Sequence, residues 1–115
     1  MTSAEWVCWL DFLGLNNRWA AKQFGVNVRT VRKWAGMDVV PSAAEAAIRQ
    51  WATYTERLVS KLTVSLSDSA DAGEQPVIYA PQDDEFMANG MPPRWYRMVS
   101  ARVAERTGFP IVWKL

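Results

Sequence analysis

The chain has 115 residues, half of them apolar and seven of them tryptophan, which is enough for one packed domain, or for a small domain with an appendage, and excludes a disordered chain. The net charge of +1 gives no global argument for nucleic acid. Because the chain has no histidine, a single cysteine, no glycine-rich phosphate loop and no cluster of metal ligands, we expect no enzyme, no metal and no small-molecule cofactor.

Two absences indicate the compartment. The sequence contains no basic-then-apolar signal peptide and no apolar run long enough to span a bilayer, so we expect no membrane contact and an intracellular location. The one cysteine, Cys8, cannot form an intramolecular disulfide, and no neighbour favours its thiolate. We expect it to be buried and inert.

Residues 3–15 predict a first helix with Ser3 as its N-cap and Gly14 near its end. One buried face is predicted by the spacing of Trp6, Trp9, Leu10 and Leu13. Further apolar residues make the helix apolar on more than one side: Val7, Cys8 and Phe12. These residues either fill a small core or contact a partner.

The stretch 16–34, NNRWAAKQFGVNVRTVRKW, predicts two short helices joined by a sharp turn. Ala21 is small where two helices approach, and Gly25 can take the left-handed conformation that ends the first helix. Val26 can then plug the turn, and Asn27 can accept a hydrogen bond from the first turn of the second helix. Asn16 or Asn17 can cap the first helix in the same way.

The second of these helices is predicted to bury Val31 and Trp34, which lie three residues apart. Its remaining face carries Arg29, Thr30, Arg32 and Lys33. Basic residues outnumber acidic ones over residues 16–50, which locally favours phosphate. Any solvated amphipathic helix shows a similar alternation, so spacing alone does not decide between DNA and solvent.

The pattern of Ala21, Gly25, Val26, Val31 and Trp34 resembles the helix-turn-helix of the lambda repressor/Cro-like superfamily. That resemblance implies that the helix around residues 28–35 enters the major groove of double-stranded DNA. On this interpretation Arg29 and Lys33 can each contact guanine. The complete set of expected DNA-binding residues is Asn16, Asn17, Arg18, Lys22, Asn27, Val28, Arg29, Thr30, Arg32 and Lys33, with those before Asn27 directed to phosphate.

Residues 42–66 predict a long amphipathic helix. Ser42 and Glu45 form a candidate capping box at its start, and the β-branched stretch 53–55 is the place where the helix would break. The apolar stripe of this helix consists of Ile48, Trp51, Thr55, Leu58 and Leu62. This stripe can complete the N-terminal bundle, pair with a second copy, or do both.

After the long helix, the sequence predicts a connector over 67–76 and a short strand over 77–79. A helical turn then begins at the acidic residues 83–85. A helix from Pro92 to Gly108 and a second strand over 110–113 complete the prediction. The three adjacent acids do not face one point, so we expect no metal there. The flanking prolines suggest that the first strand pairs on only one edge. The strands can pair with each other or with those of a second subunit.

The order of these elements is similar to that of YdiL-like proteins and anti-CRISPR-associated autorepressors, which implies a homodimer held by the C-terminal half and bound to an inverted repeat. We therefore predict a mainly α fold in which a lambda-repressor-like helix-turn-helix bundle precedes a long helix and a small C-terminal α+β dimerisation element. The predicted divisions are a DNA-binding domain (1–66), a connector (67–76) and a dimerisation region (77–115).

The predicted function is that of a sequence-specific transcriptional regulator, a homodimeric repressor in the cytoplasm of a bacterial or phage-infected bacterial cell. Two alternatives remain open at this point. A helix-turn-helix of phage or antitoxin type can bind another protein, and an excisionase-like factor can bend DNA.

Overall fold

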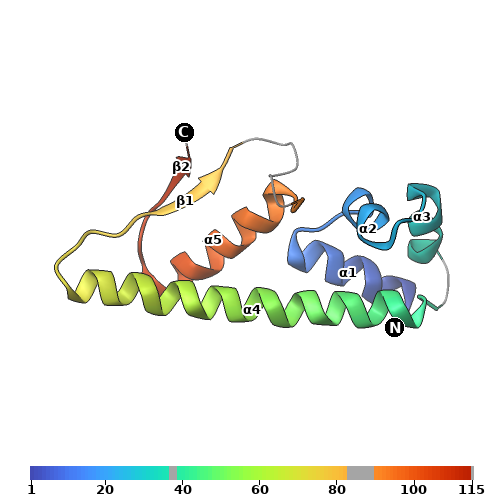
Figure 1. The fold of residues 1–115 in the computed structure, drawn as a ribbon, viewed down its shortest axis with the longest axis horizontal. Coiled ribbons are helices and arrows are strands. Elements are labelled where there is room, and N and C mark those ends of the chain that lie inside the picture. Colours follow the sequence, from blue (N-terminus) through green and yellow to red (C-terminus); the bar gives the residue numbers. More distant parts are fainter. Residues whose placement is uncertain (37–38, 83–89, 115) are drawn as a thin grey trace.

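The structure is a computed structural model that describes residues 1–36, 39–82 and 90–114. Over these residues the chain is mainly helical, with one small parallel sheet of two strands (Figure 1). In chain order the elements are α1 (Ser3–Leu13), α2 (Asn17–Phe24), α3 (Val28–Gly36), α4 (Ser42–Asp71), β1 (Ile78–Pro81), α5 (Pro93–Thr107) and β2 (Ile111–Lys114). The predicted acidic turn falls on residues 83–89, outside the described residues.

Helix α4 is the element on which the others pack. Figure 1 shows α1, α2 and α3 over its N-terminal half, and α5 with both strands over its C-terminal half. The molecule is elongated, with principal extents of 52 × 26 × 19 Å. Among the described residues, no helix combines the length and the apolar character that crossing a bilayer requires.

The N-cap of helix α1 lies one residue earlier than predicted. Thr2, not Ser3, is the N-cap: its hydroxyl accepts from the backbone N–H of Glu5 at 3.1 Å, and the Glu5 carboxylate accepts from the N–H of Thr2 at 3.1 Å. This reciprocal pair is the capping box that stabilises a helix start. The hydrogen bond from the backbone of Thr2 also lowers the pKa of Glu5.

The end of α1 touches the start of α5. Gly14 caps α1 with φ +68, and an ideal Cβ at this position would lie 2.6 Å from the carbonyl oxygen of Arg94. No side chain fits at that distance. A glycine is therefore required here for its conformation and for its size.

Helix α4 departs from its prediction at both ends. Pro41 is the N-cap and no side chain caps it; Glu45 accepts instead from the amino group of Met1, which lowers the pKa of Glu45. The helix has no break at residues 53–55 and continues past Leu66 to Asp71, so the first half of the predicted connector is helical. Residues 67–71 contain no glycine or proline, and Gly73 is the first residue after the helix with a positive φ.

A single buried cluster extends from α1 to α5. Cys8 is exposed, which contradicts the prediction that it is buried, because α1 turns Trp6, Leu10 and Leu13 to the core and Cys8 lies on another side of the helix. The exposed Phe12 lies outside the core as well. The largest fully buried side chains are those of Trp6, Trp19, Leu13, Ile48, Val31, Val59, Val103 and Thr55.

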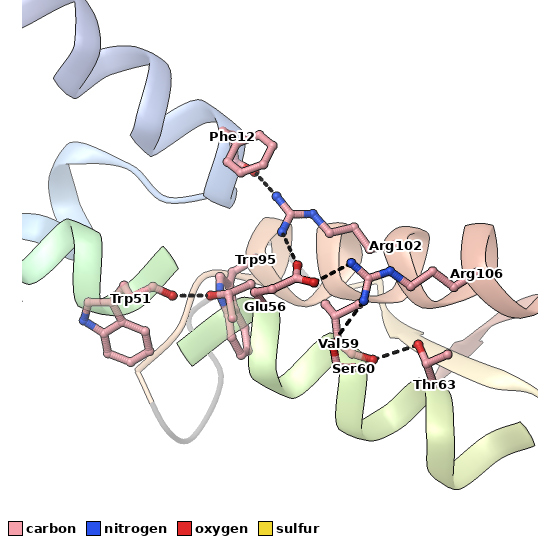
Figure 2. Close-up of polar contacts among 10 residues, drawn as sticks. Phe12, Trp51, Glu56, Val59, Ser60, Thr63, Trp95, Arg102 and Arg106 are labelled. Atoms are coloured by element: carbon pink, nitrogen blue, oxygen red, sulfur yellow. Dashed lines mark hydrogen bonds and ion pairs between the residues drawn. The ribbon is translucent and has the colours of Figure 1, made fainter. Parts of the chain in front are cut away.

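A buried polar chain joins α4 to α5. The indole N–H of Trp95 donates to the hydroxyl of Thr55 at 3.0 Å, and that hydroxyl donates to the carbonyl of Trp51 at 2.6 Å (Figure 2). Thr55 is wholly buried. Its hydroxyl therefore satisfies an indole N–H that water does not reach.

We expect the Thr55→Val substitution to lower the free energy of unfolding by about 1–3 kcal/mol, because it keeps the side-chain shape and leaves a buried N–H without an acceptor. Urea unfolding followed by tryptophan fluorescence measures this loss. Thr53→Val is the matched control, since the Thr53 hydroxyl donates to the carbonyl of Arg49 in the same way but is exposed. Equal losses in the two variants would contradict the assigned role.

Charged side chains at or near the surface also join α4 to α5. Arg106 pairs with Glu56 at 2.6 Å and donates to the hydroxyl of Ser60 at 3.2 Å (Figure 2). Arg102 lies 4.0 Å from Glu56, donates to the carbonyl of Phe12 at 3.4 Å, and places its guanidinium 4.2 Å from the centroid of the Phe12 ring. Arg102 thus joins α1, α4 and α5, and its charge is placed favourably at the C-terminal end of α1.

The strands pair with each other, in parallel, with Ile78 opposite Ile111 and Pro81 opposite Lys114. Each strand is shifted slightly toward the C-terminus of its predicted range. Pro81 fits as the last residue of β1 because its missing N–H would face away from β2. The C-terminal helix, α5, ends at Gly108 as predicted.

Candidate nucleic-acid interface

Short-range signals build the two helices α2 and α3. The Asn16 side chain accepts from the N–H of Trp19 at 2.8 Å, and the Asn27 side chain accepts from the N–H of Arg29 at 2.8 Å. Between them, Gly25 has φ +62 and its N–H returns to the carbonyl of Ala21. The predicted starts, the predicted stop and the predicted capping residues are all confirmed.

An aromatic cluster of Trp6, Phe24 and Trp34 sets the position of α3. The ring of Trp34 lies edge-on to Trp6 and to Phe24, with centroids 5.4 Å apart in each pair. These three rings come from α1, α2 and α3, one from each helix. Val31, on the same side of α3 as Trp34, is wholly buried. The inner face of α3 is therefore held rigidly by edge-to-face contacts and apolar burial.

The outer face of α3 is polar and basic. Arg29, Thr30, Arg32 and Lys33 are all exposed, as predicted. Arg29 and Lys33 lie four residues apart, on the side opposite Val31, so both point outward from the molecule. In Figure 1, α3 lies at one end of the molecule, away from α5 and the strands, so the C-terminal half does not cover this face.

The other predicted residues fall into three groups. Arg18 and Lys22 are exposed on α2, and Asn17 and Val28 are half-buried first residues of their helices. The remaining two, Asn16 and Asn27, are exposed but their side-chain oxygens are engaged as caps.

All the charged residues of α2 and α3 are basic. From Asn16 to Gly36 the sequence contains five basic residues and no acidic one. Among the residues that the structure describes, no carboxylate pairs with Arg29, Arg32 or Lys33. Like charges on one turn repel each other, and an anion placed against them relieves that repulsion.

Two details of this surface differ from the sequence prediction. Val26 does not plug the turn: its N–H caps α2 by donating to the carbonyl of Ala21, and its side chain remains 37% exposed. Gly36 is the last residue of α3, one residue beyond the predicted helix around residues 28–35.

A metal site would need several cysteine or carboxylate ligands close together within residues 1–36, 39–82 and 90–114. No group of three or more cysteine, aspartate or glutamate side chains is arranged there to hold a metal ion. Comparisons of the chain with models of protein families, with curated proteins and with solved structures found no match.

Proposed function

We propose that the chain is a sequence-specific, double-stranded DNA-binding transcriptional regulator, a homodimeric repressor that acts in the cytoplasm of a bacterial or phage-infected bacterial cell. On this proposal α2 and α3 form a helix-turn-helix of the lambda-repressor-like kind, and α3 is the recognition helix. The observation that carries the proposal is the outer face of α3, which is basic, exposed and left uncovered by the C-terminal half.

The dimensions and chemistry of α3 fit a major groove. A helix with its side chains is about 10–12 Å across, and the major groove of B-DNA is about 12 Å wide. The guanidinium of Arg29 can donate two hydrogen bonds to O6 and N7 of guanine, and Lys33 can reach a second base one turn away. Thr30 offers a methyl to thymine or a hydroxyl to phosphate, while Arg32 reaches the phosphate backbone.

Helix α2 supplies contacts that position α3. The N-terminal N–H groups of a helix attract phosphate, and α2 begins at Asn17 beside the exposed Arg18 and one turn before the exposed Lys22. Asn16 and Asn27 act here as caps that hold the two helices at their angle. We therefore assign them to positioning the interface, and Arg29 and Lys33 to base recognition.

The positions of the exposed apolar residues also support DNA, and not a protein, as the partner of the outer face of α3. The large apolar side chains that are exposed lie on α1, on α4, in the strands and, as Val26 and Val39, in the segments that flank α3; none of them belongs to α3 itself. Protein interfaces are depleted in lysine and have apolar centres. The face of α3 carries Lys33 and no large apolar side chain, whereas its arginines are common at both kinds of interface.

A homodimer follows from the size of the contact. One recognition helix reaches only a few base pairs, and a second copy related by a two-fold axis adds the other half of an inverted repeat, with half-sites about 34 Å apart or a multiple of that distance. We place this dimer contact in the C-terminal half, which leaves α3 of each copy free to enter the groove.

Selection of bound duplexes from a random pool, at two salt concentrations, tests this function. We expect a palindromic consensus whose affinity falls steeply with salt, by about 0.9 in log K per log salt for each phosphate contacted. Absence of enrichment and of salt dependence would support a protein-binding role instead. Bending in a phased gel-shift assay without a consensus would support an architectural role of the excisionase kind.

A further inference from the structure

Strand β2 has an open edge. The N–H of Ile78 donates to the carbonyl of Pro110 at 2.9 Å, which fixes how β2 faces β1. Backbone groups alternate in direction along a strand, so the N–H and C=O groups of Ile111 and Trp113 face away from β1. Among the described residues the sheet has only these two strands, and nothing pairs with that edge.

The opposite edge of the sheet is closed. The Ser100 hydroxyl donates to the carbonyl of Tyr79 at 3.3 Å, and the Arg97 Nε donates to the carbonyl of Pro81 at 3.0 Å. Pro81 has no N–H to offer a further strand. Side chains of α5 thus occupy the outer carbonyls of β1, and the sheet can be extended only at β2.

The side chains of β2 are those of an interior strand. Ile111 and Trp113 share the face of the sheet that carries the buried Ile78 and Ala80, yet they are 43% and 53% exposed because α5 packs mainly on β1. They line a groove of about 540 Å³ that Val112, Ala80 and Arg97 complete. Proteins guard a solvent-exposed edge with charges, prolines or bulges, and β2 has only Lys114 at its last position.

We infer that a second copy of this chain occupies the β2 edge, its own β2 running antiparallel to the first. The result is a four-stranded sheet in the order β1, β2, β2 of the second copy, β1 of the second copy. The two-fold axis is perpendicular to the sheet, so both α5 helices lie on the same face. The groove beside each α5 is then filled by the Ile111 and Trp113 side chains that meet between the two helices.

This arrangement is self-limiting and compatible in charge. The contact is isologous, because the same edge serves both copies, and pairing stops at two since each β1 edge is closed. With Val112 on the two-fold axis, Ile111 lies opposite Trp113 of the second copy, and their outward N–H and C=O groups pair. Lys114 then lies opposite Pro110 of the second copy, so the two lysines remain apart. A four-stranded sheet under two helices is also a more stable unit than an isolated two-stranded ribbon. The inference specifies the interface of the homodimer proposed above and rests on that part of the proposal.

The test removes one outward N–H. Trp113→Pro deletes the N–H that faces the second copy and leaves the groups that face β1; Trp113→Thr removes the same side chain and keeps the N–H. In size-exclusion chromatography with light scattering, without DNA and at tens of micromolar, we expect the wild type at twice the chain mass of 13.0 kDa, Trp113→Pro at the chain mass, and Trp113→Thr still largely dimeric.

Circular dichroism establishes that each variant is folded. Should Trp113→Pro prove misfolded, Trp113→Glu decides, because it keeps every backbone group and puts two carboxylates into the apolar contact; we expect it to be monomeric. A wild type of single-chain mass, or a folded Trp113→Pro variant that remains dimeric, would overturn the inference. Since the mass is measured without DNA, a dimer that selects no duplex would refute the proposed function and leave the β2 interface standing.

Discussion

Replacing Arg29 with alanine is expected to weaken binding to the selected operator by about 1–3 kcal/mol, or roughly 5- to 150-fold, and to relax the preference at one base pair of each half-site. The reason is that a bidentate guanidinium contact is lost while the cap of Asn27, which accepts from the backbone of residue 29, is kept. Fluorescence anisotropy with a labelled duplex, at constant salt, measures the change.

Arg57→Ala is the matched control for this substitution. It removes the same side chain from an exposed position in the middle of α4, so the net charge changes equally. We expect its operator affinity to stay within about twofold of the wild type. An Arg29→Ala variant that binds the operator as the wild type does, or two variants that lose affinity equally, would show that α3 does not make the base contacts.

Gly14→Ala is expected to be the most destabilising of the small substitutions in this chain. A non-glycine residue in the left-handed region costs about 1–2 kcal/mol, and forcing a methyl against packed structure costs typically about 1–3 kcal/mol more. The second cost applies because the Cβ would approach the backbone of Arg94 to 2.6 Å. We therefore expect the melting temperature to fall by about 10 °C or more in a thermal scan.

Gly25→Ala isolates the conformational part of that cost. Gly25 has a nearly identical φ of +62, but a Cβ there would meet nothing within 4 Å. We expect a loss of only about 1–2 kcal/mol, from backbone strain alone. If both variants lose the same stability, α1 and α5 do not approach as closely as the structure has them.

The local structure of α2 and α3 was predictable because each of its signals acts within a few residues. Asn16, Gly25 and Asn27 satisfy or terminate the backbone of their own helix, and Val31 and Trp34 share a face through helical spacing alone. The same reasoning placed Arg29 and Lys33 on the outside. A helix has few ways to arrange its faces once its buried stripe is set.

The sequence predictions that failed depend on contacts between residues far apart in the chain. Glu45 was assigned to a capping box with Ser42, and it bonds to the amino group of Met1 instead. Cys8 lies among apolar residues and was predicted to be buried, but α1 has too little neighbouring structure to cover every side. Periodicity identifies candidate faces, and only packing selects among them.

By itself, the sequence determined the helical character of the chain, the starts and stop of α2 and α3, and the basic outer face of α3, because these depend on neighbours one turn away. The tertiary structure decided that β1 and β2 pair in parallel, that Gly14 meets α5, and that Glu56 binds Arg102 and Arg106, which lie 46 and 50 residues further along the chain. Those contacts join segments with no local signal in common, so they exist only once the chain is folded.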